Sequence, residues 1–261
     1  MNRYARINRL LDLMAKEQTV DVDRAARRFG VSASTIRRDL NHLNAQQLVA
    51  RTRGGAVATS ISYDLPIRYR TAQHAPEKIR IGERAAELVP AGAIVGLNGG
   101  TTTTEVARAI ATRSAGPDAD SDQPITIVTN AINIANELTA RRHIKLVMTG
   151  GVARPQSFEL TGALATAALS LIDLDIVFLD VDAFDPFDGA KALDEEEARI
   201  NMLMASRARK VVAVADSSKL NGRAFARICP VSDVNYLITD EAAPTDALDQ
   251  LRSAGVNVLL A

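Results

Sequence analysis

Two short segments of this 261-residue chain combine residue types that bind anions. In the first, residues 31–40, hydroxyl and arginine side chains lie among the apolar positions Ile36 and Leu40. In the second, residues 97–104, two glycines are followed by four threonines. Arginine can reach DNA phosphates or guanine edges, and glycine backbone with hydroxyls at a helix start can cradle a phosphate. The chain therefore has one candidate nucleic-acid site and one candidate site for a small anionic ligand.

The first segment predicts a DNA-recognition helix. Such a helix buries one apolar stripe and presents short polar groups and arginine from its other side. Ile36, Leu40 and Leu43 recur at helical spacing and form that stripe. A basic turn beside Gly54-Gly55 could approach the DNA backbone closely. The predicted DNA-binding residues are Ser32, Ser34, Thr35, Arg37, Arg38, Arg51 and Arg53.

The second segment follows an apolar run and precedes a helical one, as expected of a phosphate-binding loop. It is neither a Walker loop, since no lysine follows the glycines, nor a dinucleotide fingerprint. Other predicted strands also end in small polar residues or lysine, and open parallel sheets bind ligands at their carboxyl ends. The predicted effector-binding residues are Asn98, Gly99, Gly100, Thr101, Thr102, Thr103, Asn130, Gly150, Gly151, Asp182 and Lys219.

Three helices and a wing must position the first set. The apolar spacing predicts helices over residues 2–16, 22–29 and 32–43, with Gly30 ending the second and Ser32 capping the third. Thr19-Val20-Asp21 interrupts the pattern and offers capping oxygens. Two short strands, 48–51 and 56–58, are expected around a turn. This order is a winged helix-turn-helix, and we expect residues 1–57 to form a DNA-binding domain.

A larger domain must position the second set. Residues 58–76 are expected to be a linker, and residues 113–124 a surface loop. A helix is expected over residues 77–89. The later strands are short apolar runs rather than alternating ones, so both faces of their sheet should be covered. Alternating strands and helices predict a doubly wound, mostly parallel α/β domain over residues 77–261, for effector binding and oligomerisation. The expected strands are 94–97, 125–129, 144–149, 176–179, 211–215, 236–239 and 256–260.

The charge balance differs between the two parts. Residues 1–57 hold eleven Lys/Arg and five Asp/Glu, a net +6, while the remainder holds twenty and twenty-six, a net −6. A basic end indicates a polyanionic partner for that end. The single cysteine excludes an intrachain disulfide, and the three histidines lack metal-ligand spacing. No run reaches membrane-spanning length. We expect a cytoplasmic protein without metal or cofactor.

The sequence resembles the DeoR family of bacterial repressors. In the N-terminal part the resemblance rests on residues 29–32, 35–40, Leu48, Arg51 and 54–56. In the remainder it rests on Glu77-Lys78, Gly100-Thr101-Thr102, Thr129-Asn130, Gly150-Gly151, Gly162, Asp175, Phe178, Gly189, Asp216-Ser217-Ser218-Lys219 and Ile238-Thr239-Asp240.

The resemblance implies that Arg37 and Arg38 face operator DNA and that Asp39 makes internal polar contacts. It also implies a sensor domain with a fold like that of ribose-5-phosphate isomerase. Such a domain binds a phosphorylated sugar or related metabolite and forms a dimer or tetramer. The expected function is therefore a repressor of a sugar-metabolism operon, without enzymatic activity.

Two departures from the family pattern bear on the effector. Asn98 stands where the family commonly has Asp, and Asp180 and Ala183 replace two family glycines. A carboxylate near a phosphate would repel it. Two other readings stay open: an isomerase in which Lys219 and Asp180 or Asp182 transfer protons, and a ligand-free body used only for oligomerisation. The effector, the operator, the regulated genes and the oligomer size are not encoded in any motif.

Overall fold

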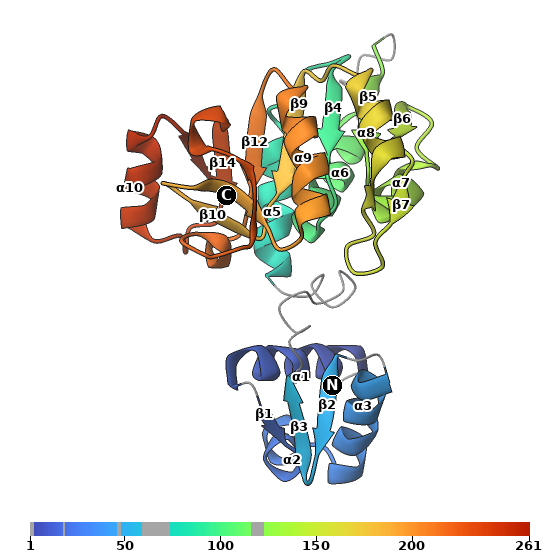
Figure 1. Cartoon of the computed structure of the whole chain (residues 1–261), viewed down its shortest axis with the longest axis vertical. Coiled ribbons are helices and arrows are strands. Elements are labelled where there is room, and N and C mark those ends of the chain that lie inside the picture. Colours follow the sequence, from blue (N-terminus) through green and yellow to red (C-terminus); the bar gives the residue numbers. More distant parts are fainter. Residues whose placement is uncertain (1–2, 18, 46–47, 59–73, 116–122) are drawn as a thin grey trace. The chain divides into compact units, whose positions relative to one another are not determined.

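The computed structural model describes residues 3–17, 19–45, 48–58, 74–115 and 123–261. The chain divides into two compact units, Met1–Gln73 and His74–Ala261, which are described separately (Figure 1). The first described helix of the second unit is α5 (Ala75–Ala86), where the sequence predicted a helix over residues 77–89. Most of the expected linker and part of the expected surface loop, residues 59–73 and 116–122, lie outside the described residues.

The first unit is a three-helix winged helix-turn-helix with one strand more than expected. Its elements are α1 (Arg3–Glu17), β1 (Thr19–Asp21), α2 (Val22–Phe29), α3 (Ala33–Ala45), β2 (Val49–Thr52) and β3 (Gly55–Ala58). The expected two-stranded wing is wrong in one respect, because β1 joins it in the order β1-β3-β2. Gly55 permits this pairing, since a Cβ there would lie 2.0 Å from the Val20 carbonyl oxygen.

The core of the first unit comes from the apolar stripes of all three helices. Leu10, Ile36, Leu40 and Leu43 are fully buried, and they lie in one cluster with residues of the wing strands. Asp21 caps α2, its carboxylate accepting from the Arg24 amide at 2.8 Å. The periodic pattern read from the sequence therefore corresponds to the packed face of each helix.

The second unit is built on a seven-stranded sheet in the order β15-β14-β12-β9-β4-β5-β6. Every neighbouring pair in this sheet is parallel, as the short apolar runs predict. The strands are β4 (Ile94–Leu97), β5 (Ile125–Thr129), β6 (Ile144–Met148), β9 (Ile176–Asp180), β12 (Val211–Val214), β14 (Tyr236–Thr239) and β15 (Asn257–Leu260).

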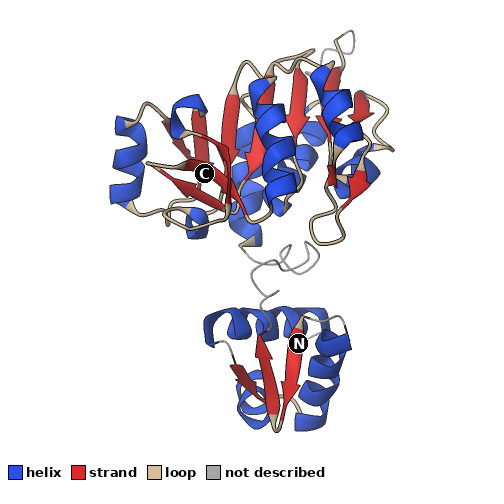
Figure 2. Cartoon of the chain, viewed as in Figure 1, coloured by secondary structure: helices blue, strands red, loops and turns tan. Residues whose placement is uncertain are grey.

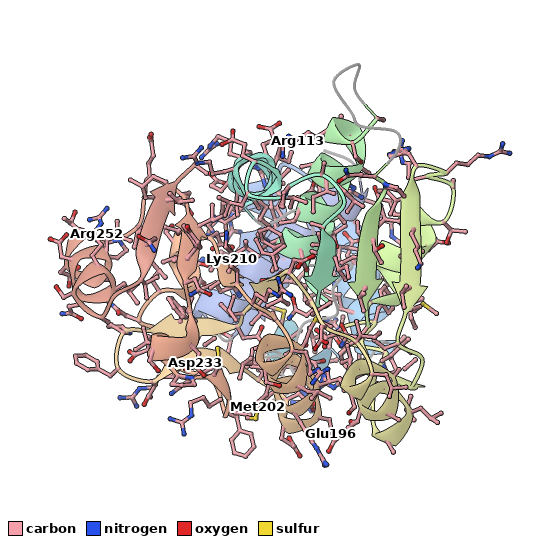
Figure 3. All side chains as sticks on the ribbon, turned by 90° about the horizontal axis from the view of Figure 1, so that it is seen from above. Arg113, Glu196, Met202, Lys210, Asp233 and Arg252 are labelled. Atoms are coloured by element: carbon pink, nitrogen blue, oxygen red, sulfur yellow. The ribbon has the colours of Figure 1, made fainter. Side chains whose placement is uncertain are left out.

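Helices cover both faces of this sheet (Figures 2 and 3). One face packs against α5, α6 (Thr101–Arg113) and α7 (Ile132–Leu138). The opposite face packs against α8 (Ala163–Ser170), α9 (Glu195–Ser206) and α10 (Thr245–Ser253). Glu196 and Met202 lie on the outer side of α9 in Figure 3. The sheet is thus doubly wound, with a packed core on each side.

The order of the strands reverses at β4. The chain adds β5 and β6 on one side of β4 and then β9, β12, β14 and β15 on the other. In folds of this class, ligands bind beyond the carboxyl ends of the strands at such a switch point, which here lies at β4 and its neighbours. The Gly99–Gly100 loop and Asp180 follow or end the two strands at this switch point.

Five short strands of the second unit were not expected from the sequence. They form a hairpin, β7 (Val152–Ala153) with β8 (Leu160–Thr161), and a small antiparallel sheet of β10 (Ala183–Asp185), β11 (Gly189–Ala192) and β13 (Ala226–Cys229). Each has at most four residues, too few for a recognisable alternation of apolar and polar side chains. The described part of the unit also contains the 3-10 turns η2 (Ser217–Lys219) and η3 (Val231–Asp233).

Across the described ranges, no helix is long and apolar enough to cross a bilayer. The same residues contain no group of three or more histidine, cysteine or acidic side chains arranged to hold a metal ion.

Candidate functional site

The turn between α2 and α3 fixes how α3 is presented. Gly30 ends α2 with φ 64°, a left-handed conformation that glycine adopts without strain. The Val31 amide then donates to the Ala26 carbonyl at 3.1 Å. Ser32 begins the next helix, its hydroxyl accepting from the Thr35 amide at 3.2 Å. These local bonds set the direction of α3 independently of its outer side chains.

The outer face of α3 is polar and basic. Ser34, Arg37 and Arg38 are exposed, whereas Ile36 and Leu40 are fully buried. The Ser32 hydroxyl also lies 2.8 Å from that of Ser34 and 2.9 Å from that of Thr35, so the start of the helix carries a cluster of neutral hydroxyls. The seven predicted DNA-binding residues thus include two exposed arginines one turn beyond a neutral helix cap.

A buried ion pair holds α3 against α1. The Asp39 carboxylate is 1% exposed and accepts from Arg6 Nε at 2.5 Å and Nη2 at 3.3 Å. The Arg6 side chain is itself only 10% exposed. The resemblance implied internal contacts for Asp39, and the geometry agrees. Asp39 therefore positions the helix and does not face outward.

The two arginines of the wing differ in their contacts: Arg53 is exposed, whereas Arg51 donates a hydrogen bond within the turn. Arg51 is half-buried and donates to the Gly55 carbonyl at 2.6 Å. Arg53 and Gly54 lie exposed at the tip, where Gly54 has φ 92°. Arg53 is consequently the wing residue best placed for contact outside the unit, and Arg51 shapes the turn that carries it.

In the second unit, a side chain ties together the two strands at the switch point. Asn98 follows β4 and is 1% exposed. Its amide Nδ2 donates to the Asp180 carbonyl at 2.9 Å, and its Oδ1 accepts from the Asp180 amide at 2.8 Å. Both ends of this predicted effector-binding side chain are thus bonded to the end of β9. Asn rather than Asp is required for this pairing, because only the amide offers a donor and an acceptor.

The Asp180 carboxylate lies at the start of α6. Its Oδ2 accepts from the Thr102 amide at 2.9 Å. A Cβ added at Gly100 would lie only 2.0 Å from the same oxygen, so this glycine is in direct contact with the carboxylate. Thr101, Thr102 and Thr103 are all buried in the first turn of α6. The residue that departs from the family glycine therefore faces the predicted phosphate loop.

A second carboxylate covers the other glycine. Glu159, on the segment leading into β8, is 2% exposed, and its Oε1 would lie 2.7 Å from a Cβ at Gly99. Asn130, which follows β5, donates from Nδ2 to Glu159 Oε2 at 3.0 Å and to the Leu160 carbonyl at 3.4 Å. Gly99, Gly100 and Asn130 are therefore brought together, with acidic side chains between them.

Lys219 lies on η2, the turn that follows the neighbouring strand β12. It is half-buried, and its amide donates to the Asp216 carbonyl at 3.0 Å. Asp216 also caps this turn, since its Oδ1 accepts from the Ser218 amide at 3.1 Å. The Ser217 amide donates to Asp240 Oδ2 at 2.6 Å. The amides of Ser217 and Ser218 in this second polar loop are thus bonded to carboxylates of the chain itself.

The pKa of the Asp240 carboxyl group is lowered, because its hydrogen bonds together outweigh the effect of burial. Burial is the largest single influence and by itself would raise the pKa of this carboxyl group. Hydrogen bonds from the amide and hydroxyl of Ser217 and from the Ala242 amide together outweigh it and hold the pKa below its ordinary value of 3.8. The carboxylate is therefore a stable charged partner of the loop that carries Lys219.

The other predicted effector residues have structural contacts. Gly150 and Gly151 follow β6 with φ 69° and 128°, and a Cβ at Gly151 would lie 2.6 Å from the Thr161 carbonyl oxygen. Close packing against β8 therefore requires glycine there. Asp182 Oδ2 accepts from the Leu193 amide at 2.9 Å, just before α9. The contacts of Gly151 thus lie with β8, and that of Asp182 with the residue pair that precedes α9.

Three charged residues near this edge were not predicted as site residues. Lys78 on α5 is 5% exposed, with Nζ 3.9 Å from Asp216 Oδ2. Its signal in the sequence is a lysine on the same helical stripe as Ile81 and Ala85. Arg154 follows β7 and reaches Asp194 at 3.2 Å and Glu197 at 3.0 Å. Glu159 and Arg154 lie in a segment without periodicity, so nothing local marked them.

Comparison with known protein families gives two matches that together span most of the chain. The model of the DeoR-like helix-turn-helix domain matches residues 6–62, and the model of the DeoR C terminal sensor domain matches residues 73–241.

Full-length relatives also match. The chain is 33% identical over 255 residues to the HTH-type transcriptional regulator GlpR of Haloferax volcanii, covering 97% of this chain and 96% of the relative. It is 30% identical over 251 residues to the glycerol-3-phosphate regulon repressor of Escherichia coli strain K12, covering 96% of each. Among solved structures, ribose 5-phosphate isomerase A of Methanocaldococcus jannaschii aligns with a TM-score of 0.43 and 17% identity, over 57% of this chain and 55% of that one.

Proposed function

Since the chain belongs to the DeoR family of helix-turn-helix transcriptional regulators, we propose that it represses a sugar-metabolism operon. Residues 1–57 read operator DNA, and residues 77–261 bind the effector and form a homo-oligomer, a dimer or tetramer. The effector is a phosphorylated sugar or related metabolite that releases the DNA. Two relatives are named for regulation, one of them for a glycerol-3-phosphate regulon, which supports an effector of this class.

The observation that carries the DNA-binding role is the exposed pair Arg37 and Arg38 on the outer face of α3. The Arg6–Asp39 pair and the buried stripe hold this helix rigidly, so the arginines can be presented in one orientation. Arginine at these positions can form bidentate contacts with guanine or contacts with phosphates. The exposed Arg53 at the wing tip would add a contact beside the recognition helix.

The effector role rests on the switch point of the parallel sheet. Asn98, the Gly99–Gly100 loop, Asn130 and Lys219 follow strands whose carboxyl ends share this edge. Folds of this class bind ligands there. Effector binding would lower operator affinity only if the two forms of the oligomer differ in effector affinity.

Regulation is favoured over catalysis at this edge. An isomerase would need a carboxylate free to take a proton from the substrate. Asp180 is bonded to the Thr102 amide and Asp182 to the Leu193 amide. Both candidate bases therefore serve as partners of the backbone.

Selection of bound duplexes from random DNA, followed by anisotropy titration, tests this proposal. We expect sequence-specific, salt-dependent binding, and at least one phosphorylated sugar of a broad panel should release the selected duplex. Such a ligand at 100 times its Kd should also stabilise the chain by about 2.7 kcal/mol. Selection that enriches no sequence would contradict the DNA-binding role, and a panel without any effect would contradict the effector class.

A further inference from the structure

Asp180 occupies the position at which an anionic ligand would meet α6. The first amides of a helix attract negative charge, and here the carboxylate of Asp180 already accepts from the Thr102 amide at 2.9 Å. Asp180 comes from β9, 78 residues further along the chain, and is held in place by the paired bonds of its own backbone to Asn98. It is therefore a fixed internal anion supplied across the switch point.

The glycines of the loop are covered by acidic side chains on both sides. A Cβ at Gly100 would meet Asp180 Oδ2 at 2.0 Å, and a Cβ at Gly99 would meet Glu159 Cγ at 2.2 Å. The open backbone that the sequence offers to a phosphate is thus in contact with two carboxylate-bearing side chains. A phosphate at this loop would lie within a few ångströms of both, where like charges repel strongly.

The same place has an acceptor that lacks a donor. Asn130 is fully buried and its Nδ2 has two acceptors, Glu159 Oε2 and the Leu160 carbonyl, which fixes the orientation of the amide. Its Oδ1 then has no hydrogen-bond partner among the described residues. A buried acceptor without a donor is unfavourable, so Asn130 Oδ1 favours a ligand group that donates a hydrogen bond.

We propose that Asp180 determines the specificity of the effector site by excluding anionic groups from the start of α6. The part of the effector at the Gly99–Gly100 loop is instead a hydroxyl-bearing, uncharged part that donates to acceptors such as Asn130 Oδ1. Any phosphate of the effector lies elsewhere along the edge, toward cations such as Lys219. This inference rests on the proposed function only in taking the edge as the effector site.

Inorganic phosphate is the probe for the anion position. Its binding to the full chain is measured by calorimetry and by thermal melting, against chloride at equal ionic strength. The variants are Asp180→Gly, which restores the family residue, and Asp180→Asn, which keeps the shape and removes the charge. Asp173→Asn is the matched control, since it removes one carboxylate whose side chain is 83% exposed and which pairs with Arg207.

We expect phosphate to bind Asp180→Gly at least about tenfold more tightly than the wild type, which corresponds to 1.4 kcal/mol. Asp180→Asn should lie between them, and Asp173→Asn should match the wild type. If Asp180→Gly does not fold, Asp180→Asn alone decides the result. Tight phosphate binding by the wild type, or no gain in the folded Asp180 variants, would make Asp180 a structural helix cap only and overturn the proposal.

Because no DNA is present, this assay gives a result even if the chain fails to bind an operator. A crystal structure of Asp180→Gly in phosphate adds a direct readout. The proposal expects phosphate oxygen within hydrogen-bond distance of the Thr102 amide. Phosphate bound only at another place would contradict it.

Discussion

Two helix starts in this chain deal with negative charge in opposite ways. α3 begins with the neutral hydroxyl of Ser32, and its exposed side chains include Arg37 and Arg38. α6 begins with buried threonines and the carboxylate of Asp180. Both starts have the backbone amides and hydroxyls that favour an anion. Among the described residues, no acidic side chain caps the start of α3, so an external anion can bind there. At α6 the Thr102 amide already donates to the Asp180 carboxylate of the same chain.

The comparison teaches that a loop rich in glycine and threonine does not by itself define a phosphate site. Whether such a loop binds phosphate depends on the group that already accepts hydrogen bonds from its amides. At α3 that group comes from the preceding turn, three residues away. At α6 it comes from a strand 78 residues away.

Asp39→Ala should have the largest effect, because it removes the group that holds the α3 face in place. It leaves Arg6 as a buried charge without its main partner, and breaking such a pair destabilises a protein by about 3–5 kcal/mol. Urea unfolding of the first unit, followed by circular dichroism, measures the change. Arg3→Ala is the control, since Arg3 is 57% exposed and lies 3.8 Å from Asp39; it should change stability by less than about 1 kcal/mol. Equal effects of the two variants would refute a special role of the buried pair.

Asn98→Asp should destabilise the second unit. The variant replaces the donor that serves the Asp180 carbonyl with an oxygen, leaving a buried acceptor unsatisfied at about 1–3 kcal/mol. Thermal or urea unfolding is the measurement. Asn136→Asp, at an exposed position of α7, makes the same chemical change and should stay within about 0.5 kcal/mol of the wild type. A stable Asn98→Asp protein would argue that Asn98 is free to bind ligand.

Acid should weaken the contact between the Asp240 carboxylate and the loop that carries Lys219, because protonation removes the charge of Asp240. The pKa of Asp240 is lowered in the folded state, so its contribution to stability is present above the unfolded value near 3.8 and is lost as the pH falls below it. Unfolding free energies of the wild type and Asp240→Asn between pH 7 and pH 3 measure this. The difference between the two proteins should shrink as the pH falls. A difference that stays constant would show that the charge of Asp240 contributes nothing.

Cys229 lies outside both candidate sites and serves as a control, and its thiol should react only very slowly in the folded chain. Burial, with Asp233 adding to it, raises the pKa of its thiol to about 12. At pH 8 the thiol stays protonated, and the thiolate is the reactive form. A thiol reagent such as DTNB should therefore label the folded chain very slowly and label the urea-unfolded chain at once. Rapid labelling of the folded chain would mean that this part of the second unit opens readily.

The sequence predicted most of what depends on local pattern. Ile36, Leu40 and Leu43 marked the buried stripe of α3, and the seven apolar runs each became a strand of the parallel sheet. It could not predict what depends on pairing across the fold. Nothing near Asn98 indicates that its amide bonds to Asp180, 82 residues away. Likewise, nothing near Gly99 indicates that Glu159 lies against it.

The short strands were missed for a related reason. β1 has three residues and joins the wing only because Gly55 lets it approach. β7 and β8 have two residues each. Segments of this length carry no period, and their structure is set by their partners. Two of the three unpredicted charged residues, Arg154 and Glu159, lie on the segment between β7 and β8.

Operator binding across a salt series shows whether the α3 face is the surface of this chain that binds a polyanion. Titrations compare the wild type with Arg37→Ala and Arg38→Ala, and with Arg252→Ala on α10 as a control (Figure 3). Loss of a phosphate contact should reduce the slope of log K against log salt by about 0.9. Loss of a bidentate base contact should weaken binding by about 1–3 kcal/mol and relax specificity. Arg252→Ala should bind like the wild type, and wild-type affinity and slope in both α3 variants would contradict the account.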